Sequence, residues 1–92
     1  MTEDVKEISL TIYNQKGLHA RAAAKFVNIT SKFKSEIKVS RDNENVSGKS
    51  IMGLLMLAAV KGTTIRITAN GGDASQVLEK LTRLIDNKFD EE

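Results

Sequence analysis

The 92-residue sequence contains no cysteine, no proline, no tryptophan and a single histidine, His19. Without cysteine the chain cannot form disulfide bonds or thiolate metal sites, and one histidine excludes a multi-histidine metal site within one chain. Aromatic residues make up only 4% of the chain, which leaves little surface on which nucleic-acid bases could stack. We therefore expect no disulfide framework, no metal site, no cofactor and no nucleic-acid partner.

The chain also lacks a long hydrophobic run. The longest apolar segment, IMGLLMLAAV over Ile51–Val60, is far shorter than the ~20 residues that a membrane-spanning helix needs. The opening residues, MTEDVKEISL, are acidic and lack the apolar centre of a secretory signal. We therefore expect a soluble, cytoplasmic protein that does not insert into a membrane.

Neither sign of charge dominates the sequence. Fourteen basic residues stand against twelve acidic ones, which gives a net charge of +2. Nucleic-acid binding needs a clustered basic stripe. Arg21, Lys25, Lys32 and Lys34 could gather on one side, but the tail Asp90–Glu92 is acidic. The length is sufficient for one hydrophobic core, so residues 1–92 are expected to form a single domain, by default a monomer.

Two periodicities of the apolar residues divide the chain into strands and helices. Apolar and polar residues alternate in segments such as Ile8–Ile12, which is typical of a strand with one buried face. Apolar residues recur every three or four positions in segments such as Val77–Ile85, which is typical of an amphipathic helix. In chain order, the predicted elements are a strand over Glu7–Tyr13, a helix over Ala20–Ser31, a strand over Lys34–Ser40, a short strand around Val46, a helix over Ile51–Ala58, a strand over Thr63–Ala69 and a helix over Ala74–Asn87.

The alternation in the strands predicts a sheet with one wet face and one face covered by helices. The predicted fold class is α+β: an open-faced β-sandwich in which three helices cover one face of a four-stranded antiparallel sheet, in the order βαββαβα. The polar stretch Arg41–Asn45 predicts a hairpin with a loop of several residues. Ser50 and Asp73 directly precede predicted helices, so both are expected to act as N-caps.

The single histidine lies where the first predicted strand gives way to the first helix, in the stretch NQKGLHARAAAKF. Gly17 allows the backbone to turn tightly just before it. His19 then falls at or beside the helix N-cap, where unpaired backbone N–H groups converge and favour anions. Arg21 adds a planar cation that suits phosphate. A lone histidine is more often a polar or capping residue, but this setting favours an imidazole that carries a phosphoryl group.

The rest of the sequence contains few other residues or motifs that are suited to catalysis. Neutral imidazole is a nucleophile that can form a covalent intermediate. The chain has no G-x-x-x-x-G-K-[ST] loop for a nucleotide, no second histidine or cysteine for a dyad, and no obvious acidic cluster. Whether the protein counts as an enzyme stays open, because the pattern favours a covalent carrier over a stand-alone enzyme with its own substrate pocket.

Two motifs resemble those of one known family. The segment GLHAR over Gly17–Arg21, followed by alanines, resembles the active-site motif of the HPr family, the histidine-containing phosphocarriers of the bacterial phosphoenolpyruvate phosphotransferase system. The segment VSGKSIMGL over Val46–Leu54 resembles the regulatory serine motif of the same family. Lys61–Gly62 and the turn Gly71–Asp73 also lie where the family has them, so the resemblance covers nearly the whole chain.

The resemblance implies an open-faced β-sandwich that relays phosphoryl groups. His19 would accept phosphate on a ring nitrogen, Nδ1 in the family, from phosphorylated enzyme I and would pass it to a IIA-type component. Arg21 would steady the phosphate. Ser50 would be phosphorylated for regulation by HPr kinase/phosphorylase where such an enzyme is present.

Two positions near the histidine depart from the common family pattern. Ala22 stands where many members have proline, which is well tolerated in the first turn of a helix. We expect the alanine to alter the stability or the rate of formation of the phosphorylated state without loss of function. Lys16 stands where many members have a small polar residue, and it adds a cation near the phosphate.

The resemblance also implies a docking surface next to the histidine. In the family, outward residues of the second helix meet partner proteins, and by position these are Ile51, Met52 and Leu55. An apolar patch with cations at its rim suits small, transient interfaces with acidic partners. The predicted partner-binding residues are Lys16, Ala20, Lys25, Lys49, Ile51, Met52 and Leu55.

Three alternative functions stay open at this point. The tail Phe89–Glu92 resembles that of a nitrogen-branch paralogue, whereas Lys49–Gly53 looks more like the kinase-regulated carriers. A purely regulatory docking module without sugar uptake is a second alternative, although serine-only relatives of that kind lack the histidine. A small RNA-binding α+β domain is disfavoured, because Tyr13 is the only aromatic candidate on a strand.

Overall fold

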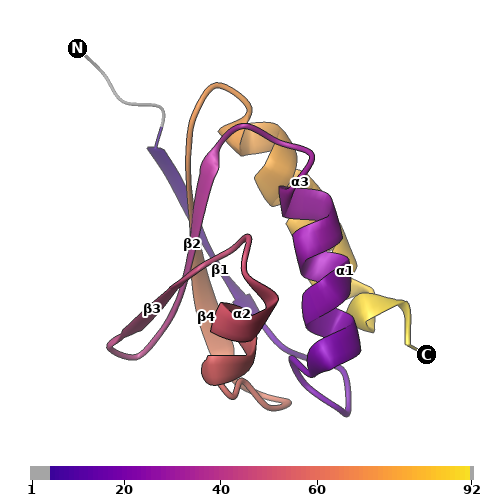
Figure 1. Cartoon of the computed structure of the whole chain (residues 1–92). Coiled ribbons are helices and arrows are strands. Elements are labelled where there is room, and N and C mark those ends of the chain that lie inside the picture. The colour runs from indigo at the N-terminus through magenta and orange to yellow at the C-terminus, as the bar shows by residue number, and fades with distance from the viewer. Residues whose placement is uncertain (1–4, 92) are drawn as a thin grey trace.

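The computed structural model describes residues 5–91 and confirms the predicted fold class. An antiparallel sheet of four strands carries three helices on one face, and the elements follow the predicted order (Figure 1). The elements are β1 (Val5–Thr11), α1 (Ala20–Thr30), β2 (Glu36–Arg41), β3 (Glu44–Ser47), α2 (Ile51–Met56), β4 (Thr64–Asn70), α3 (Ala74–Asp86) and a short 3₁₀ helix, η1 (Lys88–Asp90).

The sheet has the strand order β1-β4-β2-β3. Ile8 on β1 and Val39 on β2 both pair with Ile67 on β4, one of the two inner strands. Directly paired residues point to the same face of a sheet, so these side chains form one apolar layer beneath the helices. The other face is polar and carries an ion pair between Glu7 and Arg66, 3.7 Å apart. The predicted division into a wet and a covered face is therefore confirmed.

The core fills the space between the sheet and the amphipathic helices α1 and α3. Phe26 on α1 and Leu81 on α3 are fully buried, and burial of side chains of this size contributes about 1.5–3 kcal/mol each. The predicted apolar stripe of α3 is buried along its length, at Val77, Leu78, Leu81, Leu84 and Ile85. The docking of α1 onto this core fixes where its first turn, and with it His19, is placed.

The β2–β3 hairpin is tighter than the sequence predicted. Arg41 pairs with Glu44, so only Asp42 and Asn43 lie between the two strands, where a loop of several residues was expected. Asp42 has a φ of 54°, in the left-handed region that aspartate tolerates better than most residues. The prediction was wrong because charged residues at exposed strand ends resemble turn residues in sequence.

The second helix begins where predicted and ends two residues earlier than the predicted Ala58. Its N-cap is confirmed, because Ser50 Oγ accepts a hydrogen bond of 3.0 Å from the Gly53 N–H. After Met56 the carbonyls of Leu57 and Ala58 both accept from Arg41 Nη1, at 2.9 Å and 2.6 Å. The arginine thus satisfies carbonyls at a helix end that lack helical partners.

Asp73 occupies the N-cap position of α3 as predicted, but its side chain does not cap the helix. Its carboxylate instead accepts hydrogen bonds from the N–H groups of Lys34 (2.9 Å) and Ser35 (3.0 Å) and from the Ser35 hydroxyl. These contacts join the α1–β2 connection to the β4–α3 turn. The hydrogen bonds from the Ser35 hydroxyl and the Lys34 N–H hold the pKa of Asp73 below its ordinary value.

This network predicts an acid-sensitive contribution to stability. A depressed pKa means that Asp73 stabilises the fold above its unfolded-state pKa, and that this stabilisation is lost as the pH falls through the folded-state pKa. We expect Asp73→Asn to lower Tm at neutral pH and to reduce the drop in Tm between neutral pH and about pH 3. Thermal melting followed by circular dichroism would show this, with Asp86→Asn at the far end of α3 as the charge control. An Asp73→Asn variant with the wild-type acid dependence would contradict the assignment.

Candidate functional site

His19 is the N-cap residue of α1, as the sequence predicted. Its backbone is extended, with φ −86° and ψ −177°, and its Nδ1 accepts a hydrogen bond of 3.3 Å from the Arg21 N–H. The imidazole side chain is 26% exposed, so another protein can reach it. Nδ1 therefore lies at the positive end of α1, where backbone N–H groups without helical partners stabilise negative charge.

The loop before His19 is held close to the segment that follows α2. Gly17 has a φ of 66°, which favours glycine, and a Cβ at this position would lie only 2.6 Å from the Ala59 carbonyl oxygen. The next residue, Leu18, donates its N–H to that same carbonyl oxygen at 2.8 Å. The predicted turning role of Gly17 is confirmed, and the close approach to Ala59 adds a second reason for glycine.

Two residues that the sequence did not single out, Asn14 and Glu91, complete the surroundings of the histidine. One carboxylate oxygen of Glu91, Oε2, forms a hydrogen bond with His19 Nε2, and the other, Oε1, accepts from Asn14 Nδ2 at 3.0 Å. Asn14 is fully buried and also donates from Nδ2 to the Gly17 carbonyl at 2.8 Å. Two acceptors around Nδ2 settle the orientation of this amide. The only feature of the sequence that could have drawn attention to Glu91 is Phe89, an aromatic residue shortly after an amphipathic helix.

The local charges keep Glu91 ionised next to the imidazole. Burial by itself would raise the pKa of Glu91, but hydrogen bonds from His19 and Asn14 and the electrostatic interactions with His19 and Lys16 outweigh this effect. The net result is a pKa below the ordinary value for glutamate. At neutral pH the carboxylate is therefore an acceptor for two hydrogen bonds.

The predicted cations gather beside the histidine. A hollow of about 270 Å³ includes Lys16, Arg21 and Lys25 in its lining, which is completed by Gln15, Asp90 and Glu91. Lys25 directs its ammonium group to the Phe89 carbonyl at 2.5 Å. Cationic side chains at a helix N-terminus favour an anionic group such as phosphate. Three predicted residues thus lie together at this end of α1.

The predicted regulatory serine lies at the other end of α1. Thr30, the last residue of α1, donates from Oγ1 to the Gly48 carbonyl at 2.8 Å, and Lys49 Nζ donates to the Phe33 carbonyl at 2.9 Å. The eleven residues of α1 span about 16 Å. The structure therefore places Gly48 and Lys49, the residues just before Ser50, near the end of α1 that is opposite to His19.

The exposed apolar residues of α2 form a surface that we call the α2 patch, defined as Ile51, Met52 and Met56. Met52 and Met56 are 71% and 72% exposed, and Ile51 is 39% exposed. The predicted Leu55 is half-buried against the core, whereas Met56, one helical turn after Met52, was missed. In Figure 1, α2 lies beside α1.

No helix within residues 5–91 has both the length and the apolar character needed to cross a bilayer.

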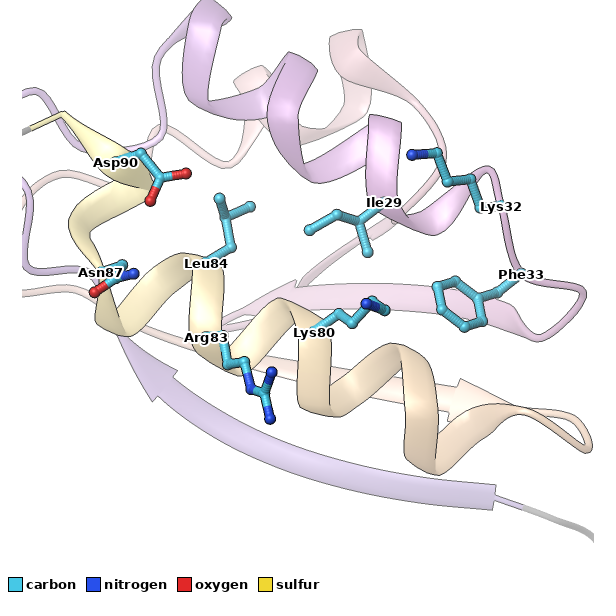
Figure 2. A pocket seen from close by; sticks show the side chains of 8 residues that line it. All are labelled: Ile29, Lys32, Phe33, Lys80, Arg83, Leu84, Asn87 and Asp90. Carbon is cyan, nitrogen blue, oxygen red and sulfur yellow. The ribbon is translucent and has the colours of Figure 1, made fainter.

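A second hollow, larger than the one beside the histidine, lies elsewhere in the described part of the chain. It has a volume of about 380 Å³ and opens between α1 and α3 (Figure 2). Its lining comprises Ile29, Lys32, Phe33, Lys80, Arg83, Leu84, Asn87 and Asp90. None of the site residues predicted from the sequence is among them, so size alone does not identify the reactive site.

The open-faced sandwich and the accessible histidine at a helix N-terminus are the features that the motif resemblance implies for a small phosphocarrier. The family model described as "PTS HPr component phosphorylation site" matches residues 6–87. The phosphocarrier protein HPr of Neisseria meningitidis serogroup A is 49% identical over 83 residues, which cover 90% of this chain and 93% of that protein. The chain therefore belongs to the HPr family of phosphotransferase-system phosphocarriers.

Solved structures and a second type of relative extend this comparison. A crystal structure of HPr-C-His from Thermoanaerobacter tengcongensis has a TM-score of 0.91 and 45% identity, and the match covers 95% of this chain and 98% of that one. An HPr dimer from the same organism has a TM-score of 0.74 and 44% identity, with 91% and 97% covered. The phosphocarrier protein NPr of Shewanella violacea is 42% identical over 85 residues, 92% of this chain and 93% of that protein. The monomeric state expected from the sequence stays a prediction.

Proposed function

We propose that this phosphocarrier accepts a phosphoryl group on Nδ1 of His19 from phosphorylated enzyme I and passes it to a IIA-type component. The observation that carries the proposal is the position of Nδ1 at the N-cap of α1, 3.3 Å from the Arg21 N–H. The Nε2 atom of the same ring faces the Glu91 carboxylate. Of the two ring nitrogens, Nδ1 thus has the surroundings that suit a phosphate.

The transfer needs only one nucleophile from this chain. The lone pair of Nδ1 forms the bond to phosphorus, while the bond from phosphorus to the donor breaks and its electron pair stays with the donor. The negative oxygens then meet the N-terminal N–H groups of α1 and the guanidinium of Arg21. Transfer to the acceptor repeats these steps with His19 as the leaving group. The chain acts as a carrier in a relay and not as a stand-alone enzyme.

In this proposal the partners dock over the start of α1 and the α2 patch. The contact set joins the exposed apolar residues of α2 to Lys16, Ala20, Arg21 and Lys25 near the histidine, and Leu55 and Lys49 extend it. Exposed apolar side chains next to cations suit an acidic partner surface and fast, reversible association. We propose that the protein works in the cytoplasm as a monomer and needs no cofactor or metal of its own.

Phosphorylation with purified donors tests the proposal. The folded protein is mixed with phosphoenolpyruvate and either a sugar-type or a nitrogen-type enzyme I, and the intact mass is measured over time. We expect the mass of one phosphoryl group to be added and to be lost in acid, because a phosphorus–nitrogen bond is acid-labile. If neither donor transfers phosphate to folded protein, the carrier role is refuted and a docking module becomes the better account.

A nitrogen-branch role is the second candidate function. It is favoured by the 42% identical NPr relative, although the HPr relative from Neisseria is more similar at 49%. The same experiment separates the two branches, because the donor that phosphorylates the protein faster identifies the branch. A purely regulatory role would instead show partner binding without phosphate on His19.

We also propose that Ser50 is a regulatory phosphorylation site, a substrate for HPr kinase/phosphorylase where that enzyme exists. Its hydroxyl oxygen caps α2, directly before the exposed residues Ile51 and Met52. A phosphate at a helix N-terminus is compatible with the fold, because negative charge is favourable there. The modification would therefore place charge on the docking surface without unfolding the helix.

Ser50→Asp is expected to weaken binding of enzyme I roughly tenfold, because it adds a negative charge where an acidic partner docks. Isothermal titration calorimetry measures the affinity. The matched control is Ser75→Asp, the same change at an exposed position in the first turn of α3, which should leave binding unchanged. Equal affinities for wild type, Ser50→Asp and a Ser50-phosphorylated sample would contradict the regulatory role.

A further inference from the structure

The short C-terminal turn η1 has an unusual backbone. Lys88, Phe89 and Asp90 have φ values of 56°, 55° and 60°, so three consecutive residues other than glycine adopt the left-handed conformation. Each of them carries a steric cost between Cβ and the backbone. Such strain persists only where the surrounding contacts fix the conformation, and it is concentrated at functional sites.

Several contacts hold this turn against the start of α1. The side chain of Phe89 is fully buried in the core, and its carbonyl accepts from Lys25 Nζ at 2.5 Å. Within the turn, Asp90 donates its N–H to the Asn87 carbonyl at 2.9 Å and Glu91 donates to the Lys88 carbonyl at 3.1 Å. Figure 1 shows the C-terminal segment beside the first turns of α1. The chain is thus turned back on itself and anchored immediately before Glu91.

The anchored turn brings the Glu91 carboxylate to His19 with little freedom. The Glu91 side chain is 14% exposed, and Asn14 Nδ2 holds its second oxygen at 3.0 Å. An ionised carboxylate can only accept hydrogen bonds. The contact with Nε2 therefore places the proton of the neutral imidazole on Nε2 and leaves a lone pair on Nδ1. The hydrogen bond from the Arg21 N–H to Nδ1 requires the same arrangement.

We propose that Glu91 is a positioning residue for the phosphoryl relay: it fixes the ring orientation and the Nε2–H tautomer of His19, so that Nδ1 is presented as the nucleophile. This inference rests on the proposed function and adds a residue to that site. When Nδ1 bonds to phosphorus and the donor departs with its electron pair, Nε2 keeps its proton, and the ring becomes a cation paired with the Glu91 carboxylate. No proton has to enter or leave in either half of the relay.

The same contact disfavours phosphorylation of the other ring nitrogen. A phosphoryl group on Nε2 would lie against the Glu91 carboxylate, and the repulsion between two anions opposes that product. A phosphoryl group on Nδ1 instead meets the N-terminal end of α1. Glu91 therefore acts on the choice of nitrogen as well as on the reactivity of the ring.

The test compares wild type with Glu91→Ala, Glu91→Gln and the control Glu79→Gln, the same chemical change on the exposed surface of α3. Single-turnover phosphorylation by phosphorylated enzyme I is measured over a range of protein concentrations, which separates the rate of the chemical step from affinity. We expect Glu91→Ala to slow the chemical step about tenfold. Removal of the hydrogen-bond partner of a metal-ligating histidine typically causes a loss of at least this size. Glu91→Gln keeps a hydrogen-bond acceptor but lacks the negative charge. Its rate for the chemical step should therefore lie between the rates of Glu91→Ala and wild type.

Nuclear magnetic resonance of ¹⁵N-labelled histidine supplies a readout that is independent of the donor. In wild type and Glu79→Gln we expect a protected Nε2–H proton and ring-nitrogen shifts of a single tautomer, and in Glu91→Ala the loss of that proton signal. Equal rates and equal ring spectra in wild type and Glu91→Ala would overturn the positioning role, as would a rate loss of equal size in Glu79→Gln. If no variant, wild type included, takes up phosphate, the proposed function fails, while the ring spectra still decide whether Glu91 orients His19.

Discussion

His19→Ala is expected to take up no acid-labile phosphate from phosphoenolpyruvate and enzyme I under conditions in which wild type is fully converted. Alanine has no nucleophilic atom to replace Nδ1, and residues 5–91 contain no second histidine. Intact mass before and after acid treatment measures the effect. A phosphate on Ser50 would survive the acid, so this treatment also separates the two proposed phosphorylation sites.

The fold of the variant needs its own control, because His19 also caps α1. Loss of the hydrogen bond between Nδ1 and the Arg21 N–H removes a cap contribution of about 1 kcal/mol, which corresponds to a decrease in Tm of roughly 4–8 °C in a domain of this size. His19→Asn retains a good capping side chain but no imidazole, and should melt close to wild type. Both variants should fail to carry phosphate. Acid-labile phosphate on folded His19→Asn would place the acceptor elsewhere.

Gly17→Ala is expected to destabilise the protein by about 2–5 kcal/mol and to slow phosphoryl acceptance about a hundredfold. The left-handed backbone at φ 66° costs an alanine roughly 1–2 kcal/mol. Its Cβ would also lie 2.6 Å from the Ala59 carbonyl oxygen and 2.9 Å from Val60 Cα, a clash with backbone that costs about 1–3 kcal/mol. Relief of the clash shifts the loop that carries His19, and shifts of about 1 Å in a reactive group can cost a hundredfold in rate.

Two other glycines provide matched controls for Gly17→Ala. Gly62 also has a positive φ, 91°, but no atom lies within 4 Å of the position that a Cβ would take there, so Gly62→Ala should lose only the backbone contribution, roughly 1–2 kcal/mol. Gly72 has the same free space without the left-handed backbone, so Gly72→Ala should be nearly neutral. Urea unfolding gives the three free energies. If Gly17→Ala were as stable as Gly72→Ala, the close packing of the His19 loop against Ala59 would be refuted.

The sequence predicted the fold because its signals are local. The alternation lies within β1 from Ile8 to Leu10, the apolar stripe lies within α3, and the Ser50 and His19 caps each directly precede the helix that they cap. Where a long-range contact competes with a local signal, the prediction was less accurate. Asp73 has the residue type and position of a cap, but a competing set of donors from Lys34 and Ser35 takes its carboxylate.

The contribution of Asn14 and Glu91 to the histidine site could not be predicted from local signals. Glu91 lies 72 positions after His19 and 77 positions after Asn14 in the sequence. No periodicity or turn rule links residues so far apart, and the contact depends on how Phe89 docks in the core. The family resemblance pointed to His19, Arg21 and Ser50 through two short motifs, and neither motif reaches the C-terminal turn.

The reversed course of the chain at η1 has a practical consequence for fusion proteins and sensors. An affinity tag, a fluorescent fusion or a tether to a chip on the carboxyl side follows the turn that places Glu91 in contact with His19. The amino end of β1 lies at the other end of the sheet, where Val5 pairs with Asn70, about 20 Å along the strand from the loop that leads to His19. If partners dock beside His19 as proposed, a label before β1 stays away from that surface, whereas a label after η1 is attached next to it.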